Sequence, residues 1–371
     1  MPAPIPLSRV HQSETIDRRI LEVVKSGNYI LGPECKAFES ELASYFDVPH
    51  CVLSSSWTAA VHLLHLAQIQ FGQISPGDEI LVPSLTAFPS IEPMIHCGIR
   101  PVFCDIDDTY TIDPEDARRR ITSKTKGILP VHLYGRPANI DGLKALAAEH
   151  DLFMIEDCAQ SHGARYQGQR AGRFGDHAAL SFYPSKNLTV YGDGGAILTH
   201  DTEMAKRVTM LRNHGRKDKY LHERVGFNLR FNEINAAVGR EQLKVLDNLN
   251  AGRRRAAELY RAGLAGISAI TLPPVDEAGN ETVYHMFVIR LDSPDRRETL
   301  ARRLKDRGIE TGVHYPVPNH LQPAIEDTFG KQPALPRTED YTRRVLSLPM
   351  WGEITEEEVG RVCAGIREAI D

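Results

Sequence analysis

The sequence predicts an α/β fold, because short apolar runs of strand length alternate with helical stretches along most of the chain. The apolar runs suit strands of a mostly parallel sheet, and the stretches between them are long enough for the helices that connect such strands. At 371 residues the chain also exceeds one ordinary domain. We therefore expect one large domain and a smaller one.

The first part of the chain predicts seven strands and seven helices. The predicted strands are His50–Leu53, Glu79–Pro83, Pro101–Cys104, Gly127–Val131, Leu152–Glu156, Ala179–Phe182 and Ala196–Thr199. The predicted helices are Ser13–Ser26, Pro33–Phe46, Thr58–Gln70, Ser90–His96, Pro114–Ile121, Ile140–His150 and Thr202–Arg212. A long pair of helices, Asn232–Leu249 and Ala251–Ala265, then leads out of this part.

The last part of the chain predicts a smaller α+β unit. Pro273-Pro274 and Asn280 interrupt the helical pattern. The elements expected after them are strand Tyr284–Leu291, helix Arg297–Arg307, strand Thr311–His314 and a final helix at Thr355–Ile370. We place the large domain at residues 1–250 and the smaller one at residues 251–371.

Composition and charge exclude several classes of function. With 42% hydrophobic and 25% charged residues and a net charge of −5, the chain offers no basic face for nucleic acid or an anionic membrane. No apolar run is long enough for a membrane span, and Met1–Leu7 does not resemble a signal peptide. Six cysteines without a Cys-x-x-Cys pair indicate reduced thiols. We expect a cytoplasmic enzyme, and no metal.

Lys186 is the most informative residue, because it lies between an apolar strand and the glycine cluster Gly192–Gly195. A lysine after a strand is usually a solvated loop charge. Here Ser181 and Ser185 supply hydroxyls, and the glycines permit close approach of a bulky ligand. A desolvated lysine has a lowered pKa and captures carbonyl groups, as in a Schiff base with pyridoxal phosphate.

Asp157 directly follows the predicted strand Leu152–Glu156, and active sites of α/β sheets gather at the carboxyl ends of strands. A buried carboxylate there suits the pyridine nitrogen of pyridoxal phosphate. The alternative is a helix N-cap, with Gln160 completing a capping box.

Two further segments carry candidate binding groups. Ser54–Thr58 joins a strand to a helix, and hydroxyls at a helix start can bind phosphate or simply cap the helix. His314–Pro318, followed by His320, is a polar and aromatic loop that suits either a sugar or phosphate contact or a structural turn. Gly226–Glu233 opens a helix and carries several polar groups.

Taken together, these segments resemble the sugar-nucleotide aminotransferases (DegT/DnrJ/StrS type) among the fold-type-I pyridoxal-phosphate enzymes. The likeness extends from Gly27–Pro33 to His314–Pro316. It implies a large domain with a seven-stranded sheet and a smaller C-terminal domain. It also implies transfer of an amino group, with L-glutamate as donor, to a keto-sugar carried on a nucleotide.

The resemblance also implies roles for individual residues. Lys186 would form the Schiff base, Asp157 would face the pyridine nitrogen, and Gln160 would lie near the ring hydroxyl. Thr58 and Ser181 would hold the phosphate. Asn228 would reach the phosphate from a second subunit, which implies a homodimer with shared active sites. The residues expected to contact the substrate are Tyr183, His314, Tyr315 and His320.

The chain departs from the family pattern at two positions. Trp57 precedes the phosphate-binding threonine, where a small residue is usual, and Ala87 stands where an aromatic or histidine usually stacks on the cofactor. We hypothesise that Trp57 supplies the missing ring contact. Phe88 is adjacent to Ala87, but neighbouring residues need not face the same way.

Three alternatives are open at this point. An aminotransferase acting on a keto-cyclitol would share every catalytic residue. A non-catalytic regulator could retain the fold, although the lysine, aspartate and hydroxyls are all present. A nicotinamide-dependent dehydrogenase would need Gly-x-Gly-x-x-Gly after an early strand, and Ser54–Thr58 does not supply it.

Overall fold

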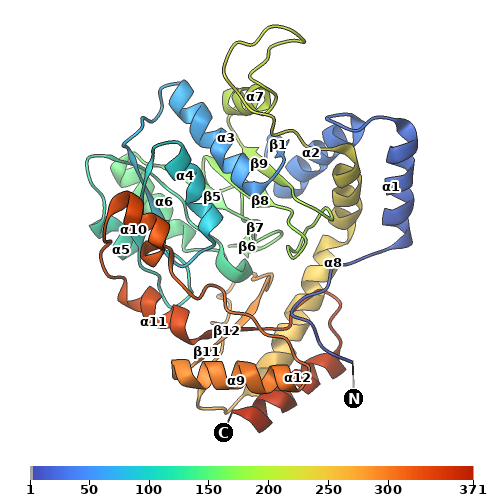
Figure 1. Ribbon diagram of the computed structural model, residues 1–371, viewed down its shortest axis with the longest axis vertical. Helices are drawn as coiled ribbons and strands as arrows, with labels where there is room; N and C mark the ends of the chain where they lie inside the picture. The colour runs from blue at the N-terminus through green and yellow to red at the C-terminus, as the bar shows by residue number, and fades with distance from the viewer. Residues whose placement is uncertain (1–2, 371) are drawn as a thin grey trace.

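The computed structural model describes residues 3–370 and has a seven-stranded sheet at its centre (Figure 1). The strand order is β1-β9-β8-β5-β4-β2-β3. Neighbouring strands run parallel except at β9, which is antiparallel to both β1 and β8. The strands are β1 (His50–Ser54), β2 (Glu79–Pro83), β3 (Arg100–Cys104), β4 (Thr125–Ile128), β5 (Phe153–Asp157), β8 (His177–Ser181) and β9 (Gly195–Thr199). The predicted mostly parallel sheet is confirmed.

Helices pack on both faces of this sheet. Ala179 of β8 belongs to an apolar cluster with the helices α3, α4 and α7, whereas its neighbours Ala178 and Leu180 belong to a second cluster with α2 and α8. This alternation follows from the two-residue period of a strand. The helices before α8 are α1 (Glu14–Ser26), α2 (Pro33–Phe46), α3 (Trp57–Gln70), α4 (Glu92–His96), α5 (Pro114–Arg119), α6 (Ile140–His150) and α7 (Thr202–Leu211), with short 3-10 turns η1 (Phe88–Ser90) and η2 (Leu133–Gly135).

A single helix, α8 (Glu233–Leu264), replaces the predicted pair of helices. Asn250 does not break it, because the buried side chain accepts a hydrogen bond from Asn187 Nδ2 and donates one to the carbonyl of His162. Gly252 does not break it either. A Cβ there would lie 1.8 Å from the carbonyl oxygen of Gly352, so this glycine serves close packing. The boundary predicted at residue 250 falls inside the helix, and the division into two domains stays a prediction.

The C-terminal part is built on a three-stranded antiparallel sheet, β10-β11-β12. The predicted strand Thr311–His314 is wrong, because only Gly312 pairs with Ser347 before the prolines that follow. The elements of this part are β10 (Ile270–Thr271), β11 (Phe287–Leu291), α9 (Pro294–Asp306), η3 (Asn319–Leu321), α10 (Pro323–Phe329), α11 (Pro336–Arg344), β12 (Val345–Leu348) and α12 (Glu356–Ala369). The sequence did not predict α10, α11, β12 or the short hairpin of β6 (Arg165–Tyr166) and β7 (Gln169–Arg170).

Two global features bear on the sequence predictions. Within residues 3–370 we find no helix with the length and apolar character of a membrane span. All six cysteines are unpaired thiols. The cytoplasmic location stays a prediction.

Candidate active site

A cavity of about 250 Å³ lies at the carboxyl ends of the parallel strands. It brings together most of the residues that the sequence predicted. Its lining residues are Ser56, Trp57, Thr58, Thr86, Ala87, Pro89, Ser90, Val131, Asp157, Ala159, Gln160, Ser181, Tyr183, Lys186, Asp193 and Gly194. A larger cavity, of about 1020 Å³, lies between α2, α7 and the segment after α7, but it contains none of the predicted residues. The chemistry therefore points to the smaller cavity.

Lys186 lies in the connection between β8 and β9, where its backbone N–H donates to the carbonyl of Tyr183. The side chain is partly buried and borders the cavity. Burial lowers the pKa of Lys186 to about 8, although the negative charge of Asp157 opposes the shift. An amine with this pKa is partly unprotonated near neutral pH, so it can act as a nucleophile or a base.

Gly195 fixes the lysine connection against the start of α3. A Cβ at Gly195 would lie 2.4 Å from the backbone carbonyl of Ser56 and 2.6 Å from the backbone nitrogen of Trp57. No real side chain tolerates such contacts. The glycine after Lys186 therefore lets β9 begin directly beside the helix terminus that the sequence predicted as a phosphate site.

Asp157 is the last residue of β5 and is 3% exposed. Its Oδ1 accepts the backbone N–H of Ala159 at 3.0 Å, and its Oδ2 accepts the hydroxyl of Ser90 at 2.8 Å. Burial raises the pKa of Asp157, while these two hydrogen bonds and the charge of Lys186 oppose the rise. The carboxylate does not cap a helix, because a turn follows β5. Asp157 and Lys186 line the same cavity, and each charge influences the pKa of the other group.

The start of α3 offers free donors to an anion. Ser56 is the N-cap, and its hydroxyl accepts the N–H of Ala59 at 3.0 Å. The N–H groups of the first helical residues, Trp57 and Thr58, have no partner within a helix and add to the positive end of its dipole. Ser181, the last residue of β8, brings a hydroxyl to the same cavity. This arrangement suits a phosphate group.

Gln160 is held on both sides of its amide. Its Oε1 accepts the backbone N–H of Tyr134 at 2.7 Å, and its Nε2 donates to the hydroxyl of Tyr315 at 3.1 Å. Tyr315 itself does not line the cavity, but it contacts the lining residue Gln160. Burial raises the pKa of Tyr315 to about 12, and Asp157 reinforces the rise, so the phenol stays protonated and able to donate.

The other predicted substrate residues lie at different distances from the cavity. Tyr183 lines it and is 54% exposed, so its ring stands at the rim. His314 lies behind the wall, with Nδ1 at 2.9 Å from the hydroxyl of Ser347. Burial lowers the pKa of His314 to about 4, and the charge of Lys186 adds to the effect.

His320 and Asn228 do not line the cavity of their own chain. His320 is buried, with Nδ1 at 2.7 Å from the Ser84 hydroxyl and Nε2 at 3.3 Å from a carboxylate oxygen of Glu339. Both ring nitrogens are therefore engaged, and the geometry favours a structural role over the predicted substrate contact. Asn228 is exposed on the segment between α7 and α8, which projects from the body (Figure 1).

Sequence reasoning missed Ser90 and Thr86. The hydroxyl of Ser90 binds Asp157, and it lies 2.9 Å from the hydroxyl of Thr86. The sequence prediction for Pro83–Phe88 concerns only a residue that stacks on the cofactor ring. Ala87 does line the cavity, as does Trp57, whereas Phe88 packs into the apolar core beside it. A signal was present, since this segment follows the carboxyl end of β2.

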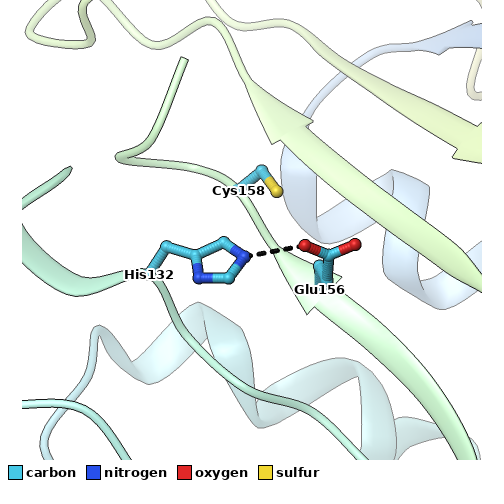
Figure 2. A group of neighbouring side chains, drawn as sticks. All are labelled: His132, Glu156 and Cys158. Carbon is cyan, nitrogen blue, oxygen red and sulfur yellow. Dashed lines mark hydrogen bonds and ion pairs between the residues drawn. The ribbon is translucent and has the colours of Figure 1, made fainter. Parts of the chain in front are cut away.

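One group of side chains behind the cavity has the composition of a metal site. Figure 2 shows His132, Glu156 and Cys158, whose donor atoms lie within 4.8 Å of one another. However, Nε2 of His132 is 2.9 Å from Glu156 Oε2, and Nδ1 accepts the backbone N–H of Ala138 at 3.0 Å. A metal would have to displace these hydrogen bonds. The group is therefore better explained as an internal polar cluster.

Comparisons with known proteins agree with this site. The chain is 44% identical over 353 residues to a dTDP-3-amino-3,4,6-trideoxy-alpha-D-glucose transaminase of Streptomyces venezuelae, covering 95% of this chain and 91% of the relative. The crystal structure of S. venezuelae DesV in complex with a ketimine intermediate superposes with a TM-score of 0.93 at 41% identity, covering 100% of this chain and 99% of that one. The PLP-form of the putative sugar aminotransferase Spr1654 from Streptococcus pneumoniae gives a TM-score of 0.92 at 26% identity, covering 99% of this chain and 98% of that one.

The fold is thus that of the fold-type-I aminotransferases. A family model also matches residues 10–367, nearly the whole described chain. The chain belongs to the DegT/DnrJ/EryC1/StrS aminotransferase family.

Proposed function

We propose that this protein is a pyridoxal-phosphate-dependent aminotransferase that converts a keto-sugar carried on a nucleoside diphosphate into an amino sugar. The family and the names of the relatives support this reaction. The observation that carries it is the pairing of Lys186, whose pKa is lowered to about 8, with buried Asp157 in one cavity. The keto-cyclitol and regulator alternatives are not favoured, because the most similar relative reported above is named as a sugar-nucleotide transaminase.

The residues around the cavity fit pyridoxal phosphate. Lys186 would hold the aldehyde carbon, and Asp157 would face the ring nitrogen. The start of α3, with Thr58 and Ser181, would bind the phosphate. Gln160 would lie near the ring hydroxyl. Each of these assignments is a proposal that rests on the side chains sharing one cavity.

The protein's own groups supply proton transfer and charge. When bound, the cofactor supplies an electron-withdrawing ring that takes up the electron pair released at the donor's α-carbon. The Nζ of Lys186 removes the proton from that carbon, and its lowered pKa keeps part of the amine unprotonated for this step. The carboxylate of Asp157 would keep a proton on the ring nitrogen, and its 3% exposure would protect this interaction from water.

We propose L-glutamate as the amino donor and a homodimer as the working form. Tyr220 and Val225, on the segment between α7 and α8, are 80% and 82% exposed, and a second copy would cover them. Asn228 lies on the same segment, away from its own cavity. It would bind the phosphate in the partner's site. Tyr183 and Tyr315 would contact the sugar substrate, and His314 would support that wall from behind.

The test of the cofactor lysine is reduction with borohydride followed by peptide mapping. We expect the pyridoxyl label on the peptide that carries Lys186, and no label in Lys186→Ala. A label on another lysine, or none in the wild-type protein, would refute the assignment. Donor and acceptor panels then test the substrates, with glutamate against other amino acids and keto-sugar nucleotides against keto-inositols.

The shared site is tested by mixing two inactive variants. Lys186→Ala and Asn228→Ala each damage a different residue of one composite site. If the site is shared, hybrid dimers contain one site with both native residues, and mixing restores part of the activity. If each chain holds its own complete site, the mixture stays as inactive as its components. Size-exclusion chromatography with light scattering checks that hybrids form.

A further inference from the structure

The carboxylate of Glu156 is a fully buried hydrogen-bond centre. Its Oε1 accepts the N–H groups of Phe174 and Gly175, at 2.7 and 2.8 Å. Its Oε2 accepts the N–H of Gly172 at 2.9 Å and contacts Nε2 of His132 at 2.9 Å. Burial by itself would raise the pKa of Glu156, but the hydrogen bonds from His132 and the backbone lower it. The side chain therefore remains a carboxylate.

The hydrogen bonds define the state of His132. A backbone N–H can only donate, so Nδ1, which faces the N–H of Ala138 at 3.0 Å, must be an acceptor. The proton then lies on Nε2 and points to Glu156 (Figure 2). His132 is thus a neutral imidazole that fixes the loop up to Ala138 on one side and β5 on the other.

The backbone of His132 continues this connection to the active site. Its N–H donates to the carbonyl of Asp157 at 3.1 Å, and the N–H of Asp157 donates to the carbonyl of Pro130 at 2.8 Å. Val131, between these two residues, pairs with Asp157 and lines the cavity. Successive strand residues face opposite sides of a sheet, so Glu156 points away from the cavity and Asp157 points into it.

We propose that His132 and Glu156 are positioning residues that set the direction of the Asp157 carboxylate toward the cofactor's ring nitrogen. The side-chain bond between them holds the Pro130–His132 segment against β5, and that segment holds the backbone of Asp157. The inference rests on the proposed function, because it presupposes that Asp157 meets the ring nitrogen.

The test compares two ligands on the full-length protein freed of its cofactor. Pyridoxamine phosphate carries the ring nitrogen, and its 1-deaza analogue has a carbon there. Both bind without a covalent bond to Lys186. We expect the wild-type protein to prefer the former. His132→Asn keeps an acceptor for Ala138 but is too short for Glu156, whereas His132→Gln places an amide N–H near the original Nε2.

We expect His132→Asn to lower the affinity for pyridoxamine phosphate by about tenfold, the size of one lost charged hydrogen bond, and the analogue's affinity by less than about twofold. His132→Gln should recover most of the preference. If His132→Asn does not fold, Glu156→Gln takes its place, and the same two affinities are measured on that variant. The matched control is His177→Asn, a buried histidine of β8 that is bound to Thr199 and lies outside the cavity.

Two results would overturn the inference, and they are distinguishable. If the variants of His132 or Glu156 lose affinity for both ligands equally, or for neither, the pair does not position Asp157. If the wild-type protein itself does not distinguish the ligands, the proposed role of Asp157 fails, and the inference fails with it.

Discussion

Replacing Lys186 with methionine should make the cofactor-free protein more stable at neutral pH. Burial lowers the pKa of this lysine from an ordinary 10.5 to about 8. One pKa unit corresponds to about 1.36 kcal/mol, so keeping the ammonium in the native cavity at pH 7 costs about 3 kcal/mol. Methionine has a similar volume and no charge. We therefore expect the free energy of unfolding to rise by about 3 kcal/mol in Lys186→Met.

The stability gained by Lys186→Met should depend on pH in one direction. Between about pH 8 and 10.5 the unfolded lysine keeps its proton while the native one has lost it, so the wild-type protein gains stability as pH rises. The free energy of unfolding of Lys186→Met should exceed that of the wild type by the whole of about 3 kcal/mol below pH 8, and by close to zero above pH 10.5. Urea unfolding at fixed protein concentration measures it, and exposed Lys206→Met serves as control. The reasoning would be refuted if Lys186→Met were no more stable than the wild type at pH 7. It would also be refuted if the difference in their free energies of unfolding did not change with pH.

Three further predictions concern the cavity and its supports. Asp157→Ala should lower turnover by about 10²–10³-fold, because the ring nitrogen loses its charged partner; steady-state rates near wild type would contradict this. Gly195→Ala should cost about 1–3 kcal/mol of unfolding free energy, since its Cβ would overlap the backbone of Ser56, whereas Gly360→Ala in α12, with open space around it, should be neutral or stabilising. His320→Ala should lower the free energy of unfolding by about 1–3 kcal/mol and leave the Michaelis constant for the sugar nucleotide unchanged. A raised Michaelis constant in a variant of undiminished stability would instead support the predicted contact between His320 and the substrate.

The sequence was most informative where chemistry follows from strand order. Asp157 and Lys186 could be placed together because each follows a strand of one predominantly parallel sheet, and such strands end at the same edge. Ser181 and Thr58 could be added for the same reason. The expected strands and helices of the large sheet then needed only small shifts at their ends.

The remaining features depend on contacts that local patterns do not encode. Ser90 reaches Asp157 across 67 positions of sequence, so its role appears only once β2 and β5 are placed. The break predicted at residue 250 does not form, because the amide of Asn250 is buried, accepts a hydrogen bond from Asn187 and donates one to His162. His320 was predicted to contact the substrate because it lies near a polar loop, but its two ring nitrogens are hydrogen-bonded to Ser84 and Glu339.

The unbroken course of α8 constrains how this enzyme can open and close. A hinge at residue 250 would sever helical hydrogen bonds and pull Asn250 away from Asn187, the residue next to Lys186. Large swings of the C-terminal sheet about that point are therefore disfavoured. Access for a bulky sugar nucleotide must instead depend on side chains and loops at the rim, such as Tyr183, so the unliganded and liganded backbones should be nearly superimposable.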